Sequence, residues 1–126
     1  MHEAITDPTK KFILVPDLGS DLVRIYAIKA GTTAVTPLTP IPAVKGSGPR
    51  HAGFSVQGKN TYFYTVNEIS NTITGYTVQY NGDAAPTFTQ ILHFSTHGPG
   101  GSVPAGTKAA ELVVSVSSFH GLLLLP

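Results

Sequence analysis

The sequence predicts an all-β fold with about two four-stranded antiparallel units followed by an incomplete third. Glycine and proline supply 13 and 10 of the 126 residues, a composition that favours short strands separated by turns over helices. Several segments alternate apolar and polar residues with the two-residue period of a strand. One such pattern occurs twice. The length of the chain leaves room for one ordinary domain.

The repeated pattern has an offset of 50 residues. Residues 12–28 align with residues 62–78, and in both copies an apolar run, a polar turn and a second run follow one another as in a hairpin. Repeats with a period of 20–50 residues indicate an architecture built from similar units. The matched pairs include Asp17 with Asn67, Ser20 with Ser70, Asp21 with Asn71, Val23 with Ile73 and Tyr26 with Tyr76.

Each copy contains four candidate strands. In the first copy they cover residues 3–6, 12–15, 22–28 and 35–38, and in the second copy residues 52–56, 62–65, 72–78 and 87–94. Turns are expected at residues 7–10 and 57–60, and Asn81-Gly82-Asp83 is a strong turn signal. Asp17 and Asn67 are expected to bond nearby backbone within their turns. Residues 110–115 look like the opening strand of a further unit.

Four-stranded units of this length are typical of β-propeller blades. The boundaries are expected at residues 1–47, 48–105 and 106–126, the last being an incomplete unit whose residues 116–121 lack a compact turn. A propeller is stabilised by packing blade against blade around a ring. We therefore expect two apolar blade faces to be exposed, and these could support self-association.

Composition and charge exclude several classes of function. The absence of cysteine rules out a disulfide framework, a thiolate metal site and a cysteine nucleophile. The net charge of +1 provides no basic footprint for nucleic acid. We expect no export signal and no membrane association, because the polar start and the short apolar run at residues 122–125 fit neither. A soluble, cytoplasmic protein is expected.

Three motifs, in this order, resemble those of a known family. They are residues 2–9 continued by residues 12–23, then Gly46-Ser47-Gly48-Pro49-Arg50-His51, then residues 66–72. Together they resemble the seven-bladed β-propeller lactonases, a family that includes 6-phosphogluconolactonases and carboxy-muconate lactonising enzymes. The resemblance extends to about residue 115 and implies a piece of a longer protein. The residues after Ser115 depart from the family pattern, so we expect a truncated, mis-spliced or frame-altered tail.

The resemblance implies that His2, Arg50 and Glu68 face a central channel as catalytic residues. Arg50 would also hold an acidic substrate through its planar fork of donors, with His51 and Lys108 as further substrate-binding candidates. His2 and Glu68 would share proton transfer, and either could be the base. No metal or other cofactor is expected. The structural alternatives are an unanchored terminus for His2, a solvated loop for Arg50, a turn carboxylate for Glu68 and a packed ring for His51.

The expected function is metal-independent hydrolysis of an acidic sugar lactone, such as 6-phosphogluconolactone, to the open acid. One alternative is a catalytically inactive propeller fragment, either an interaction piece or a partial gene product. Another is a fragment of a muconate-type lactonising isomerase, although the further arginine of that site is not found here. We expect negligible activity from the isolated chain, because a channel site built from several blades loses its preorganised donors when blades are missing.

Overall fold

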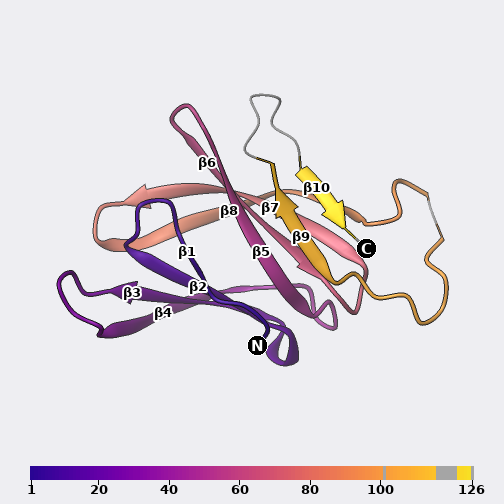
Figure 1. Ribbon diagram of the computed structural model, residues 1–126, viewed down its shortest axis with the longest axis horizontal. Helices are drawn as coiled ribbons and strands as arrows, with labels where there is room; N and C mark the ends of the chain where they lie inside the picture. Colours follow the sequence, from indigo (N-terminus) through magenta and orange to yellow (C-terminus); the bar gives the residue numbers. More distant parts are fainter. Residues whose placement is uncertain (101, 116–121, 126) are drawn as a thin grey trace.

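The computed structural model describes residues 1–100, 102–115 and 122–125. It shows two four-stranded antiparallel sheets followed by a two-stranded hairpin (Figure 1), which confirms the predicted all-β propeller fragment. The first sheet has the order β1-β2-β3-β4, and the second has the order β5-β6-β7-β8. The strands are β1 (Ile5–Thr6), β2 (Phe12–Asp17), β3 (Leu22–Ile28), β4 (Val35–Pro42), β5 (Pro49–Gln57), β6 (Asn60–Asn67), β7 (Thr72–Asn81) and β8 (Ala84–Ser95).

The 50-residue repeat is visible in the backbone. Asp21 and Asn71 each end the turn between the second and third strands of their sheets, with φ angles of 52° and 53°. This left-handed conformation is rare for residues other than glycine, and Asp and Asn tolerate it best. In the first sheet the turn contains a short 3-10 helix, η1 (Leu18–Ser20). The two copies therefore share a turn geometry as well as a strand pattern.

The strands extend beyond several predicted boundaries. β4 continues to Pro42 and β8 begins at Ala84, whereas β1 is limited to Ile5–Thr6. β4 contains three prolines. It can do so because it is the edge strand of its sheet, where a proline without an N–H need not break a hydrogen bond to a neighbouring strand. The sequence-based prediction ended this strand at residue 38, four residues too early.

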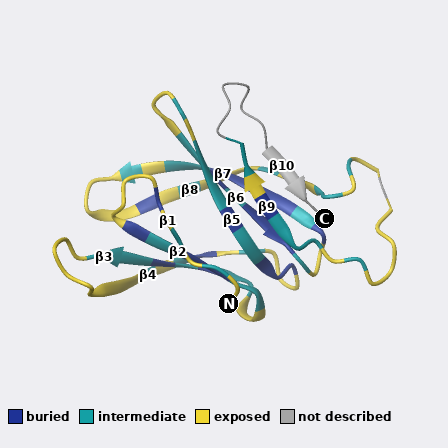
Figure 2. Ribbon diagram, in the orientation of Figure 1, coloured by how far each residue is buried: buried dark blue, intermediate teal, exposed yellow. Residues whose placement is uncertain are grey.

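An apolar core joins the two sheets. Phe63 of β6 is fully buried, and its ring lies 4.9 Å from that of Phe54 and 5.6 Å from that of Phe88. Figure 2 shows buried residues along the inner strands and exposed residues in the hairpin loops and along the edge strands β4 and β8. The buried core residues from both sheets are Phe12, Leu14, Val23, Ile25, Ile41, Ala52, Phe63 and Tyr76. The two units therefore pack against each other as neighbouring blades do.

The hairpin packs on the other side of the second sheet. It comprises β9 (Glu111–Val114) and β10 (Leu122–Leu125), paired antiparallel with Leu122 opposite Val114. Leu112 forms a second buried cluster with Val66 and Ile73. The sequence predicted β9 but not β10, because four consecutive leucines carry no alternating pattern. The expectation that residues 116–121 lack a compact turn falls outside the described residues.

The left-handed turn residues hold the segments that lead into the next unit. The Asp21 carboxylate accepts hydrogen bonds from the backbone N–H groups of Gly46 (2.7 Å) and Gly48 (2.9 Å). Asn71 similarly donates from Nδ2 to the carbonyl oxygen of Thr107 at 2.8 Å. These contacts fix the entry of the chain into β5 and into the segment before β9.

The expectation for Asp17 and Asn67 is wrong, since both bond side chains. Asp17 Oδ2 accepts from Arg24 Nε at 2.7 Å, and Asn67 Nδ2 donates to the hydroxyls of Thr72 and Thr74 at 3.0 and 3.1 Å. Asp17 and Asn67 are the last residues of β2 and β6, and their bonding partners lie on the strands paired with these, β3 and β7. Among the described residues, no helix is long and apolar enough to cross a membrane.

Candidate functional site

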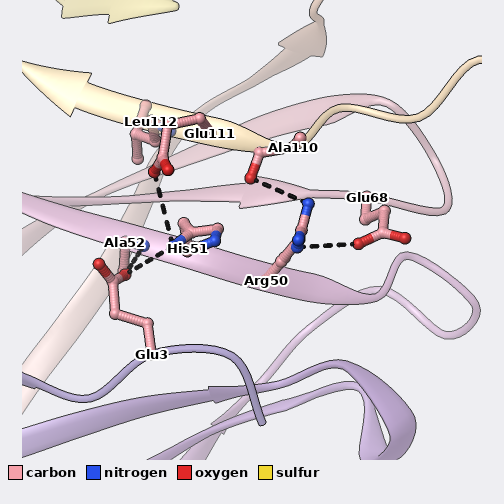
Figure 3. A network of polar contacts seen from close by, with 8 residues as sticks. All are labelled: Glu3, Arg50, His51, Ala52, Glu68, Ala110, Glu111 and Leu112. Carbon is pink, nitrogen blue, oxygen red and sulfur yellow. Dashed lines mark hydrogen bonds and ion pairs between the residues drawn. The ribbon is translucent and has the colours of Figure 1, made fainter. Parts of the chain in front are cut away.

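Arg50 and Glu68 form an ion pair at one end of the second sheet (Figure 3). Arg50 lies on β5, and Glu68 follows the last residue of β6. Arg50 Nε is 3.1 Å from Glu68 Oε2, and the two side chains are 27% and 21% exposed. The Nε–H is buried and is not aligned for a hydrogen bond with the carboxylate, so the attraction is a close ion pair. Both side chains keep some access to solvent.

A close backbone approach at Gly48 brings this pair together. The carbonyl oxygen of Gly48 accepts the N–H of Glu68 at 2.8 Å, and that of Ser47 accepts the N–H of Ile69 at 3.1 Å. Gly48 has a φ of +66°, and a Cβ atom at this position would lie 2.8 Å from Ile69 Cδ1. Only glycine combines this conformation with this proximity. The loop before β5 can therefore rest directly on the turn that carries Glu68.

Arg50 also reaches the third unit. Its Nη1 donates to the carbonyl oxygen of Ala110 at 3.3 Å, just ahead of β9. No hydrogen bond with a described residue engages Nη2. A guanidinium group carries five N–H donors in a planar fork that suits carboxylate and phosphate. The arrangement leaves donors on Arg50 for an anionic ligand.

His51 lies beside Arg50 and faces two carboxylates. Its Nδ1 is 3.5 Å from Glu3 Oε2 and 3.5 Å from Glu111 Oε1 (Figure 3). Glu3 Oε2 also accepts the backbone N–H of Ala52 at 2.7 Å, which fastens the segment before β1 to β5. Glu111 is the first residue of β9. The side chains around His51 therefore come from three successive units.

The other two candidates from the sequence lie apart from these contacts. His2 is exposed and directly precedes the anchored Glu3. Lys108 is exposed in the segment before β9. Neither makes a hydrogen bond or an ion pair with any residue in the described part of the chain. Arg50, Glu68 and His51 are thus brought into one region, whereas His2 and Lys108 are not joined to them by any of these contacts. The functional roles of all five residues stay predictions.

Glu3 and Glu111 are the residues that the sequence analysis missed. The strand registers place Glu3 and His51 at corresponding positions: Ile5 pairs with Leu14, Gly53 pairs with Tyr64, and residues 14 and 64 are repeat partners. Glu3 and His51 each lie two residues before the first member of these pairs. The correspondence between Glu3 and His51 was present in the repeat, but it becomes visible only when the pairing registers of the strands are known. Within the described residues, no group of three or more histidine, aspartate and glutamate side chains is arranged to hold a metal ion.

Comparisons with known proteins agree with the fold and identify relatives. A family model described as "Lactonase, 7-bladed beta-propeller" matches residues 1–119. An Arthroderma benhamiae protein named "Probable 6-phosphogluconolactonase" is 40% identical over 123 residues, which cover 94% of this chain and 29% of that protein. The 6-phosphogluconolactonase of Sodalis glossinidius is 38% identical over 94 residues, which cover 72% of this chain and 27% of the relative.

Two solved structures share the fold. A Lactobacillus plantarum protein superposes with a TM-score of 0.70 at 23% identity, covering 99% of this chain and 40% of that one. A Bacteroides uniformis protein gives a TM-score of 0.63 at 23% identity, covering 75% of this chain and 26% of that one. The chain spans less than a third of the length of the curated relatives described above. The match over residues 1–119 confirms the resemblance found in the sequence, and the chain belongs to the family of seven-bladed β-propeller lactonases.

Proposed function

We propose that this chain supplies part of the channel-side site of a propeller lactonase that hydrolyses an acidic sugar lactone, such as 6-phosphogluconolactone, to the open acid. The observation that carries the proposal is the geometry of Arg50, which is held by Glu68 and by the Ala110 carbonyl while keeping free donors. The names of the A. benhamiae and S. glossinidius relatives support this choice of substrate.

In this proposal Arg50 is the anchor for the anionic end of the substrate. A guanidinium group already oriented by two protein contacts loses little freedom when it binds a carboxylate or phosphate. Glu68 holds the guanidinium and shares proton transfer with His2, while His51 and Lys108 contact the substrate. The reaction needs no metal, since water activation and oxyanion stabilisation can both come from side chains and N–H groups.

The second candidate is a propeller piece without catalysis of its own. The observation that favours it is the extent of the chain, which provides two sheets and a hairpin and covers 29% of the A. benhamiae relative. Each preorganised donor lost from such a site costs a factor of about 10² or more in rate. We therefore propose that the isolated chain binds the anion but does not turn over the lactone. A cytoplasmic location is proposed with it, and the absence of cysteine is compatible with a reducing compartment.

The test uses the purified chain with 6-phosphogluconolactone and with its product, 6-phosphogluconate. We expect lactone opening no faster than the spontaneous reaction, together with product binding that shifts the backbone NMR signals of Arg50 and Glu68. Arg50→Ala should abolish those shifts. Arg24→Ala is the matched control, because it also removes an arginine paired with a carboxylate, 2.7 Å from Asp17.

Two results would count against the proposal. Equal binding by wild type and Arg50→Ala would remove Arg50 as the anchor. Turnover by the isolated chain that disappears in Arg50→Ala would show that these blades are sufficient for catalysis and would overturn the expected inactivity.

A further inference from the structure

The surroundings of His51 resemble those of an oriented catalytic base. Two carboxylate oxygens, from Glu3 and Glu111, each lie 3.5 Å from Nδ1, and that nitrogen is buried without an aligned hydrogen bond. The ring as a whole is 16% exposed. Two carboxylates therefore face one edge of a largely buried imidazole.

This arrangement determines which ring nitrogen carries the proton. A neutral imidazole has one N–H and one lone pair, and the hydrogen-bonding surroundings decide which nitrogen carries the N–H. A lone pair on Nδ1 would point at two negatively charged oxygens, which is repulsive, whereas an N–H there is attracted to both. The two carboxylates therefore favour the neutral tautomer with its N–H at Nδ1 and its lone pair on Nε2.

Nε2 remains available for chemistry. No described residue forms a hydrogen bond with it. An imidazole whose Nδ1–H faces a carboxylate and whose Nε2 is open is the arrangement used by general bases in hydrolases. The carboxylate orients the ring and stabilises the imidazolium that forms during the reaction.

A bulge in β5 brings His51 and Arg50 to the same neighbouring segment. The pairing register shifts between Pro49, opposite Asn67, and His51, opposite Val66, so that Arg50 is the extra residue. Consecutive strand residues normally point to opposite faces, and a bulge re-aims a side chain. Accordingly, Arg50 contacts residue 110 and His51 contacts residue 111 (Figure 3).

We propose that His51 is an acid/base residue of this site, and that Glu3 and Glu111 are positioning residues that hold its Nδ1–H and leave Nε2 as the base. The proposal rests on the proposed lactonase function and refines it, because it assigns to His51 the proton transfer that was given there to Glu68 and His2. His51 Nε2 takes a proton from water while the water oxygen bonds to the lactone carbonyl carbon. The bond between that carbon and the ring oxygen then breaks, and the imidazolium returns the proton to the departing oxygen. One lactone and one water give one hydroxy acid.

The charged groups around His51 suit this cycle. Glu3 faces it from the segment before β1 and Glu111 from β9, while the paired Arg50 and Glu68 adjoin it on the β5 side. The two carboxylates favour a transient positive charge on the ring. An anion held by Arg50 would place the rest of the lactone beside the neighbouring residue, His51.

The first test reads the tautomer of His51 in the intact chain. Long-range proton–nitrogen NMR correlations of the ¹⁵N-labelled protein, recorded where the rings are neutral, distinguish a protonated ring nitrogen from an unprotonated one. We expect Nδ1–H to predominate at His51 and to give way to Nε2–H in the Glu3→Gln, Glu111→Gln double variant. His97 is the internal control, because its Nδ1 contacts a hydroxyl, Thr96 Oγ1, at 3.2 Å and neither substituted glutamate.

Predominant Nε2–H at His51 in the wild type would overturn the proposal, and so would a tautomer ratio that is the same in the wild type and in the double variant. If the double variant does not fold, Glu111→Gln alone tests the same point. Its carboxylate is 46% exposed, so the replacement leaves little buried polarity unsatisfied.

The second test measures the reactivity of Nε2. Diethyl pyrocarbonate acylates unprotonated ring nitrogens, and peptide masses show which histidine has reacted. We expect His51 to react at Nε2 and to be protected by 6-phosphogluconate, with no such protection at His93 or His97. An unreactive His51 would remove it from the acid/base role. A His51 left unprotected by 6-phosphogluconate that the NMR signals show to be bound would do the same.

These tests are separable from the test of the proposed function. Loss of the expected tautomer removes the role of His51 and leaves Arg50 as anchor. Loss of product binding at Arg50 removes the lactonase assignment and leaves the tautomer result standing.

Discussion

Tyr80 fastens the second sheet to the first through a charged acceptor. Asp7, in the turn between β1 and β2, accepts the Tyr80 hydroxyl at 2.7 Å across 73 residues of sequence. The same carboxylate accepts the backbone N–H groups of Lys11 (2.9 Å) and Phe12 (2.8 Å), and both the N–H and the hydroxyl of Thr9. Replacing Tyr80 by phenylalanine removes only the bond between the blades.

The expected loss of stability is about 1–2 kcal/mol. A hydrogen bond to a charged group contributes roughly 1.5–3 kcal/mol to stability. Tyr80 is only partly buried, which places its bond near the lower end of that range. Asp7 keeps its four donors within the turn, so Tyr80→Phe adds no penalty for an unsatisfied buried carboxylate.

Urea unfolding of the 126-residue chain measures this loss directly. Tyr80→Phe should lower the midpoint without changing the denaturant slope. Tyr26→Phe is the matched control, because Tyr26 lies on β3, is also partly buried, and its hydroxyl makes no hydrogen bond with any described residue. Equal midpoints for Tyr80→Phe and Tyr26→Phe would refute the claim that this hydroxyl joins the blades.

The contribution of the bond depends on pH in a direction set by Asp7. Burial raises the pKa of Asp7, but the hydrogen bonds from Thr9, Tyr80 and Phe12 outweigh burial and leave the pKa below its usual value. The unfolded carboxyl titrates near 3.9, so this stabilisation is complete above about pH 4 and is lost as the pH falls through the lower folded pKa. Burial first, and then the bond to Asp7, raise the pKa of Tyr80, so its hydroxyl stays protonated and donating at neutral pH. The difference between wild type and Tyr80→Phe should therefore shrink in acid.

Three further predictions concern packing and assembly. Gly48→Ala should lower the free energy of unfolding by about 1–3 kcal/mol more than Gly46→Ala in urea. Both positions have a positive φ, but only the Cβ at position 48 would meet Ile69. Equal losses in the two variants would show that this clash does not matter. Phe63→Ala should lower the free energy of unfolding by about 3–5 kcal/mol, measured by thermal or urea unfolding. Phe94→Ala should lower it clearly less, because Phe94 is 38% exposed. The reverse order would contradict the assigned core. In size-exclusion chromatography with mass measurement, we expect association that increases with concentration through the exposed blade faces, and a clean monomer at all concentrations would contradict this.

The sequence was sufficient for the fold because strand patterns are local. The pair Tyr26 and Tyr76 revealed the repeat, and the alternation of apolar residues around Val23 and Ile25 predicted the buried face of β3. It was insufficient for β10, whose leucines carry no period, and for the true ends of β4, where the prolines of an edge strand resemble a turn. Boundaries of this kind depend on the partner strand.

The candidate site was only partly readable from sequence. Arg50 and Glu68 followed from the family resemblance and His51 from its place beside Arg50, and the structure brings these three into one region. Glu3 and Glu111 could not be predicted, because their contacts with His51 arise only when the three units pack side by side. The roles of Asp21 and Asn71 in holding the next segment were missed for the same reason, since their partners lie 25 to 36 residues away.

The most direct test of the central claim transfers these residues into a complete ring. Residues 1–115 of this chain would replace the matching segment of the 40%-identical A. benhamiae relative, and kcat/KM for 6-phosphogluconolactone would be measured. We predict hydrolysis by the chimera, a loss of about 10²-fold or more in kcat/KM with Arg50→Ala, and little change with Arg24→Ala. A chimera that hydrolyses the lactone equally well with and without Arg50 would contradict the account.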